Sequence, residues 1–100
     1  MESSPTMNDR LRQAGEHYEQ RVGDELIVLK VHELGGRYFG MNTTGARIWD
    51  IIRETPRIVD LCDRMAAEYI LDRPSLEKEI LAFVRLLENR GLICVERAAT

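Results

Sequence analysis

The chain has 100 residues, 44% of them hydrophobic and 31% charged, with 14 basic and 17 acidic side chains for a net charge of −3. This composition excludes a disordered chain, a collagen-like repeat and a coiled-coil rod, and the length suits one domain with a single core. A net negative surface does not attract nucleic acid or anionic lipid over a distance. We therefore expect neither nucleic acid nor a membrane among the partners.

Targeting signals and cysteine chemistry are also limited by the sequence. The longest uninterrupted apolar run is Ile80-Leu81-Ala82-Phe83-Val84, far short of the roughly 20 residues of a membrane span. The polar start, Met1-Glu2-Ser3-Ser4-Pro5, does not resemble a secretory signal. Cys62 and Cys94 form no Cys-x-x-Cys pair and lie among apolar residues, so we expect buried free thiols and a cytoplasmic location.

Residues 1–14 are polar and show no sustained periodicity, so we expect a flexible tail followed by one domain over residues 15–96 and a short tail at 97–100. Three strands are predicted next, at residues 16–22, 25–33 and 37–41. Gly23-Asp24 marks the first turn and Gly35-Gly36 the second. Apolar residues occur on both faces of the second strand, which predicts that this strand is central.

Three helices follow the strands. Asn42 or Thr43 can cap the first, Thr55-Pro56 is expected to start the second, and the third is expected to run from about Pro74 to Arg90 and end at Gly91. The predicted core positions of the three helices are Ile48, Trp49 and Ile52; Ile58, Leu61, Cys62, Met65 and Tyr69; and Leu76, Ile80, Phe83 and Leu87. Leu81, Val84 and Leu86 lie outside the centre of the third stripe. Residues 92–95 suggest a final strand or wing, and the whole order predicts an α+β fold.

No motif for catalysis or cofactor binding is recognisable. His17 and His32 are the only imidazoles, and neither has the neighbouring ligands that a metal site needs. The chain lacks a phosphate-binding loop and a nucleophile elbow. Cys62 lies on the apolar stripe of a helix, which does not suit a reactive thiol. We therefore expect no enzyme activity, no metal and no cofactor.

The third strand has the properties of a peptide-binding edge. Residues 37–41, Arg37-Tyr38-Phe39-Gly40-Met41, are rich in aromatic side chains, and only Arg37 is charged. An exposed edge presents unpaired backbone groups that can bind an added peptide strand. The pattern alone equally allows a core strand whose edge is covered by the helices. It also does not decide whether Tyr38 or Phe39 points its N–H outward.

Three segments resemble one known family. They are Phe39-Gly40-Met41-Asn42-Thr43-Thr44-Gly45-Ala46-Arg47-Ile48-Trp49, then Ile58-Val59-Asp60-Leu61, and finally residues 83–93, which end in Gly91-Leu92-Ile93. Their order and spacing are similar to those of the PqqD-like proteins, the precursor-peptide recognition elements of ribosomally made, modified natural products. The resemblance covers residues 17–95. The sequence departs from the family at Arg53-Glu54-Thr55-Pro56, where an Asp-Gly is common.

The resemblance implies a three-stranded antiparallel sheet followed by a winged helix-turn-helix-like bundle of three helices. It also implies binding of the leader of a precursor peptide as an added strand on the third strand, packed against the third helix, and presentation to a separate modifying enzyme such as a radical-SAM enzyme or a leader peptidase. The chain would act as a monomer or weak homodimer. The peptide-binding residues carried over are Arg37, Tyr38, Phe39, Gly40, Met41, Leu76, Glu77, Ile80, Leu81 and Val84.

The alternative function is a DNA-binding winged helix-turn-helix regulator, since three helices after a small sheet also suit that class. A DNA-reading helix should be basic, because phosphate contacts dominate affinity. The acidic and basic side chains between Asp72 and Arg90 cancel, which favours peptide binding over DNA binding.

Overall fold

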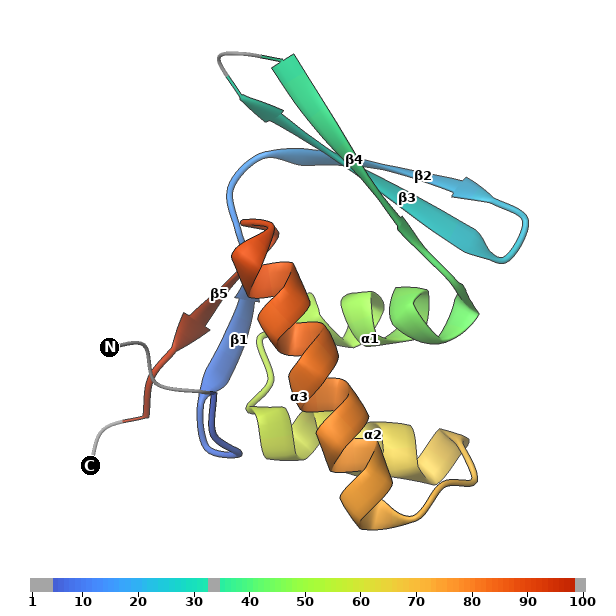
Figure 1. The fold of residues 1–100 in the computed structure, drawn as a ribbon, viewed down its shortest axis with the longest axis vertical. Helices are drawn as coiled ribbons and strands as arrows, with labels where there is room; N and C mark the ends of the chain where they lie inside the picture. The colour runs from blue at the N-terminus through green and yellow to red at the C-terminus, as the bar shows by residue number, and fades with distance from the viewer. Residues whose placement is uncertain (1–4, 33–34, 99–100) are drawn as a thin grey trace.

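The structure is a computed structural model that describes residues 5–32 and 35–98. The elements in chain order are β1 (Arg10–Gln13), β2 (His17–Val22), β3 (Glu25–His32), β4 (Gly35–Met41), α1 (Thr43–Ile52), α2 (Ile58–Glu68), α3 (Arg73–Asn89) and β5 (Ile93–Glu96) (Figure 1). Among the described residues, β2, β3 and β4 form one antiparallel sheet in that order, and β1 and β5 form a second. The predicted α+β class and the central position of the second strand are confirmed.

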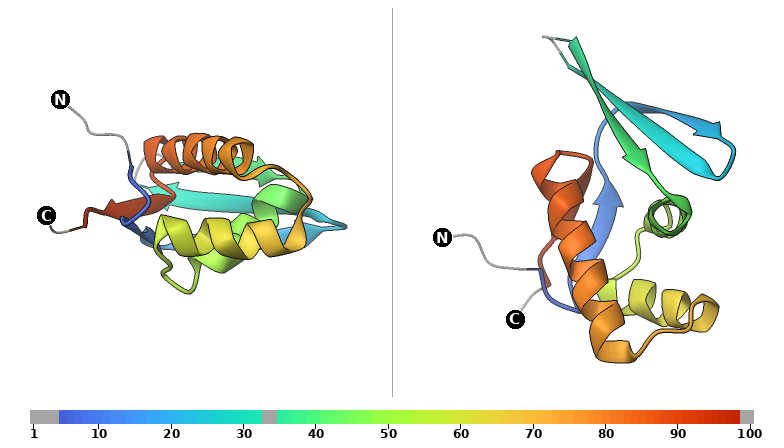
Figure 2. Two further views of the ribbon diagram at one scale, coloured as in Figure 1. Left: turned by 90° about the horizontal axis from the view of Figure 1, so that it is seen from below. Right: turned by 45° about the vertical axis from the view of Figure 1, so that its right-hand side comes forward.

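The helices all lie on one side of the β2–β3–β4 sheet, with α1 nearest to it (Figure 2). Leu26 and Val28 of β3 point toward the helices and are fully buried, whereas Ile27 and Leu29 on the opposite face are only half-buried. This difference follows from the period of two in a strand. One face of the sheet therefore closes the core and the other carries no helix among the described residues.

The second predicted turn is wrong. Gly35 and Gly36 belong to β4 and pair with His32 and Val31 of β3, so these glycines extend the sheet instead of ending it. Glu33, the predicted last residue of the second strand, lies outside the described residues. A glycine pair favours a turn nearby but does not fix which residues form it. Here the strand pairing continues through both glycines.

The expected flexible tail through residue 14 is also wrong, because Arg10–Gln13 is a strand paired with β5. Leu11 is fully buried, and its N–H donates to the carbonyl of Pro56 at 2.8 Å. Just before β1, the carboxylate of Asp9 accepts hydrogen bonds from the backbone N–H of Ala98 and from Arg97. A single buried leucine in a polar segment gives too weak a pattern to predict this strand.

Side chains cap the first and third helices, and the cap at Asn42 was predicted from the sequence. Asn42 Oδ1 accepts the N–H of Gly45 at 2.9 Å, and Asp72 accepts the N–H of Ser75 at 3.0 Å. Beyond α3, Gly91 adopts a φ of +72°, a conformation that glycine reaches without strain.

The predicted start of the second helix is wrong, since α2 begins at Ile58 after the N-cap Arg57. Thr55 has a φ of +57°, outside the helical region. The carbonyl of Pro56 accepts a hydrogen bond from Leu11 of β1. Thr55 and Pro56 therefore belong to the loop between α1 and α2, which contacts β1, and do not start a helix.

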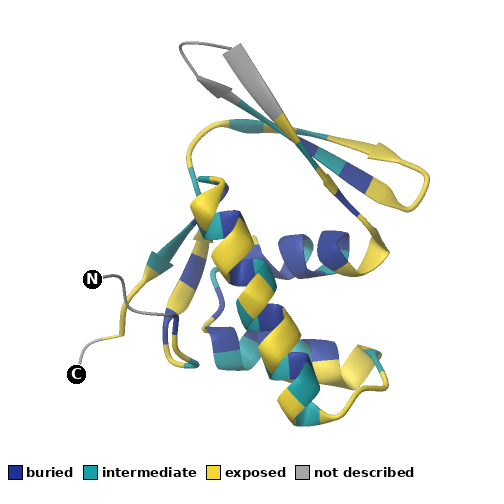
Figure 3. Cartoon of the chain, in the orientation of Figure 1, coloured by how far each residue is buried: buried dark blue, intermediate teal, exposed yellow. Residues whose placement is uncertain are grey.

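The core joins all three helices and both sheets (Figure 3). The predicted apolar stripes are confirmed for Ile48, Trp49 and Ile52 of α1 and for Leu76, Ile80 and Leu87 of α3, all of which are buried. Two positions on α3 differ from the prediction. Val84 is fully buried in the core, while Phe83 is only half-buried, so the buried stripe is rotated by one residue toward Val84.

Candidate functional site

β4 is an edge strand of its sheet, because β3 is its only neighbour among the described strands. An edge strand presents alternate backbone N–H and C=O groups to the outside. The question left open by the sequence is which residues of β4 present these groups.

The hairpin between β2 and β3 answers this question. Val22 pairs with Glu25 across a two-residue turn, in which Gly23 has a φ of +62° and Asp24 does not share the positive φ. This matches a type II′ turn, whose flanking residues form a hydrogen-bonded pair. Glu25 therefore bonds to β2, and because a central strand alternates its partners, Leu26 and Val28 bond to β4.

It follows that Phe39 and Met41, which pair with Val28 and Leu26, direct their backbone groups inward to β3. Tyr38 and Gly40 then direct their N–H and C=O groups to the open edge. The edge thus offers the N–H and C=O groups of Tyr38 and Gly40 for hydrogen bonds with an added strand.

The side chains of β4 divide between the two faces of the sheet. Tyr38 is 74% exposed on the face away from the helices, whereas Phe39 is half-buried and Met41 is buried on the helix side. The ring of Phe39 lies 6.5 Å from that of Phe83 on α3, measured between centroids. The guanidinium of Arg90 lies over the Phe39 ring at 5.8 Å. The β4 edge therefore has an aromatic and cationic wall beside it, supplied by the C-terminal half of α3.

A cavity of about 470 Å³ opens where β4 ends. Its lining is mostly apolar and comes from the start of α1, the end of α2, the α2–α3 connection and α3; it includes Asn42, Ile48, Met65, Leu76, Ile80 and Phe83. A Cβ added at Gly45 would lie 3.2 Å from the Phe83 ring, so the glycine lets this ring pack against α1. Ile70 and Leu71 at the rim are exposed. Such a hollow next to an open edge suits an apolar side chain of a bound peptide.

The predicted residues of the third helix are placed in three different environments. Leu76 and Ile80 are buried but line the cavity, so they can contact a ligand there. Val84 is fully buried. Glu77 is ion-paired with Arg73, and Leu81 packs against the core from the side of the helix opposite Phe83.

Of the predicted strand residues, Tyr38, Phe39, Gly40 and Met41 lie on the edge as described, and the side chain of Arg37 lies outside the described part. Two residues were missed as site candidates, Phe83 and Arg90. Phe83 was assigned to the core because its spacing fits the apolar stripe. The register between α3 and β4, which brings both residues to Phe39, cannot be read from helical periodicity.

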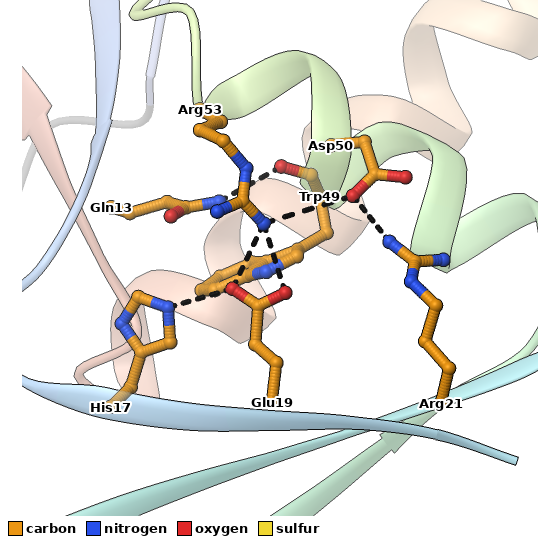
Figure 4. Close-up of polar contacts among 7 residues, drawn as sticks. All are labelled: Gln13, His17, Glu19, Arg21, Trp49, Asp50 and Arg53. Carbon is orange, nitrogen blue, oxygen red and sulfur yellow. Dashed lines mark hydrogen bonds and ion pairs between the residues drawn. The ribbon is translucent and has the colours of Figure 1, made fainter.

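A polar cluster fixes the sheet to α1 (Figure 4). Arg53 at the end of α1 donates to both carboxylate oxygens of Glu19 on β2 at 2.9 Å, and His17 Nε2 lies 2.8 Å from Glu19 Oε2. Arg21 of β2 pairs with Asp50 of α1 at 2.6 Å. These contacts hold β2, and through it the whole sheet, at one distance from the helices.

The pKa of Glu19 reflects this cluster. Burial alone would raise it, but the Trp49 indole N–H, His17 and Arg53 outweigh burial and hold the pKa of this carboxyl below its ordinary value. The indole N–H is buried and lies toward the carboxylate without a hydrogen bond of normal geometry. The ring of His17 packs edge-on against Trp49, with 5.3 Å between centroids. Glu19 is therefore a charged anchor of the fold and not a proton donor near neutral pH.

The remaining chemical groups that the structure describes give no sign of a second kind of site. Burial raises the pKa of the Cys62 thiol to about 11, so this cysteine is protonated and unreactive at neutral pH. Cys94 is half-buried, against the expectation that both thiols are buried. In the described ranges no three His, Cys, Asp or Glu side chains gather in a way that could hold a metal, and no helix there is long and apolar enough to cross a membrane.

Comparisons with known proteins show which family the chain belongs to. The sequence profile of the family described as Coenzyme PQQ synthesis protein D (PqqD) matches residues 25–93. The chain belongs to the PqqD family. A solved structure, TbiB1 in complex with the TbiA(beta) leader peptide, is similar to this PqqD-family chain with a TM-score of 0.71 and 31% sequence identity, over 89% of this chain and 99% of that one. No curated protein sequence matched.

Proposed function

We propose that this PqqD-family protein binds the leader segment of a ribosomally synthesised precursor peptide and has a binding role without catalysis. The open β4 edge, with outward backbone groups at Tyr38 and Gly40, is the observation that carries the proposal. This edge lies beside the Phe39–Phe83 contact and next to the cavity. The similarity to TbiB1, whose structure contains a leader peptide, supports it.

The leader would add to the sheet as a further strand. Backbone hydrogen bonds to residues 38 and 40 would supply affinity independent of sequence, and side chains on the helix side would supply selectivity. Gly40 fits this role, because it is exposed and a Cβ there would meet nothing within 4 Å. The fold itself does not require a glycine at this position, whereas a close approach of another backbone favours one.

The proposed contacts are Arg37, Tyr38, Phe39, Gly40 and Met41 on β4, Leu76 and Ile80 in the cavity, and Phe83 on α3. The bundle α1–α3 followed by β5 suits a winged helix-turn-helix arrangement that binds a peptide instead of DNA. We further propose that a radical-SAM enzyme or a leader peptidase receives the bound precursor. The protein itself would act in the cytoplasm as a monomer or weak homodimer.

A binding selection tests the proposal. The purified protein is used to select from a phage-displayed library of random 16-residue peptides, and the TbiA(beta) leader peptide is measured in parallel. Selected peptides, made synthetically with a fluorescent label, should bind with saturable anisotropy changes, and a labelled DNA duplex at low salt should not bind. Failure to select any peptide, or duplex binding that weakens steeply with added salt, would contradict the proposal.

A further inference from the structure

Arg90 differs from most arginines in the described part of the chain in having no carboxylate partner there. Arg47, Arg53 and Arg73, for example, pair with Glu68, Glu19 and Glu77. Arg90 is exposed, and its guanidinium lies over the Phe39 ring at 5.8 Å. A cation is therefore held beside the β4 edge with its hydrogen-bond donors available to another molecule.

The end of α3 does not explain this cation. A helix C-terminus favours a positive charge, because its last carbonyls lack partners. Lys30 of β3 already supplies that charge, since its Nζ donates to the carbonyl of Gly91 just beyond the helix. The aromatic ring of Phe39 orients the Arg90 guanidinium without neutralising it.

The geometry of an added strand brings a peptide side chain to this cation. Because Phe39 directs its backbone groups to β3, an antiparallel peptide residue opposite Phe39 forms a non-hydrogen-bonded pair with it. Side chains in such pairs are close, with Cβ atoms about 4.5–5.5 Å apart. The peptide side chain opposite Phe39 points to the helix side, as the Phe39 side chain does, and so comes within reach of Arg90.

We propose that Arg90 is a specificity-determining residue that pairs with a carboxylate side chain of the bound leader. This inference rests on the proposed function and narrows the ligand to an acidic peptide. The acidic residue lies at a helix-facing position of the added strand. Residues on one face of a strand recur every second position. The acidic residue is therefore two or four positions along the peptide from the apolar residue that enters the cavity at the end of β4.

The experiment uses the same display library and the full-length protein. Selected peptides should be enriched in Asp or Glu two or four residues from an apolar side chain. R90E should weaken their binding at least about tenfold, as expected for loss of a charge-assisted contact. Replacing the peptide acid by Lys should weaken binding to the wild type and restore binding to R90E.

R85E is the matched control. Arg85 is also exposed on α3 and has no carboxylate partner among the described residues, but it lies about 200° around the helix from Phe83. R85E makes the same change in net charge and should leave affinity within about twofold of the wild type. Equal loss in R85E and R90E, or selected peptides without an enriched acid, would overturn the inference while peptide binding itself stands. Failure of the wild type to bind any peptide would overturn the proposed function as well.

Discussion

Proline substitutions at adjacent residues of β4 should separate peptide binding from folding. Tyr38 directs its N–H to the open edge, so Y38P removes a donor that the fold does not use. Losing one backbone hydrogen bond to the peptide costs about 0.5–1.5 kcal/mol, and the proline ring also fills the place of the amide hydrogen. We expect affinity to fall at least about tenfold with little change in stability.

Phe39 directs its N–H to the buried residue Val28, so F39P should have the opposite effect. It leaves a buried carbonyl without its donor, at about 1–3 kcal/mol, and removes a half-buried aromatic ring. Together these losses should lower the free energy of unfolding by about 2–5 kcal/mol, a large part of the 5–15 kcal/mol typical of a domain.

Urea denaturation and anisotropy titration with a selected peptide measure the two effects. Y38A is the control for the side chain of Tyr38, which points away from the helices, and should bind nearly as well as the wild type. A Y38P protein that binds normally, or an F39P protein as stable as the wild type, would refute the assignment of the outward groups on β4.

Three further substitutions test the architecture. W49A removes a fully buried ring and should cost about 3–5 kcal/mol in urea denaturation; a stable variant that has lost only peptide binding would assign Trp49 to the site instead. L11A should cost about 2–5 kcal/mol if β1 is part of the cooperative fold, whereas no change would indicate a detachable segment. Folding lowers the pKa of Glu19, so the charged carboxylate stabilises the fold at pH values above the ordinary pKa of 4.5. That stabilisation is lost as the pH falls through the lower pKa of the folded state. E19Q should therefore reduce stability at pH 7 by about 1 kcal/mol and flatten the loss of stability below pH 4.5, as followed by thermal unfolding at several pH values; an unchanged pH profile would contradict this role.

Periodicity predicted the elements with strong patterns. Apolar residues on both faces of β3 and the apolar stripe of α1 through Trp49 were sufficient to predict a central strand and a core helix, and the structure confirms both. Leu11 is the only fully buried residue of β1, so that strand depends on tertiary partners, β5 and Pro56, that no local pattern reveals. Gly35 and Gly36 show the same limit of local patterns. Both prefer turns, but in the structure both pair with β3.

Only the β4 part of the candidate site could be predicted from the sequence. The aromatic residues of β4 are visible in the sequence, but the direction of their backbone groups follows from the hairpin register set at Gly23. On α3 the apolar pattern placed Phe83 in the core and left Arg90 at a helix end. The crossing of α3 past β4 brings both to Phe39, and sequence spacing within one helix contains no information on that crossing.

The hydrogen bond from the Ala98 N–H to the Asp9 carboxylate, 2.8 Å long, joins segments near the two ends of the described chain. The described chain therefore begins and ends beside β1 and β5, while β4 lies on the other sheet (Figure 1). Domains whose ends meet at the surface tolerate insertion into other proteins and circular permutation. We therefore expect this domain to tolerate insertion into a loop of a foreign enzyme, with the proposed peptide-binding edge on β4 left free to recruit substrates that carry a leader.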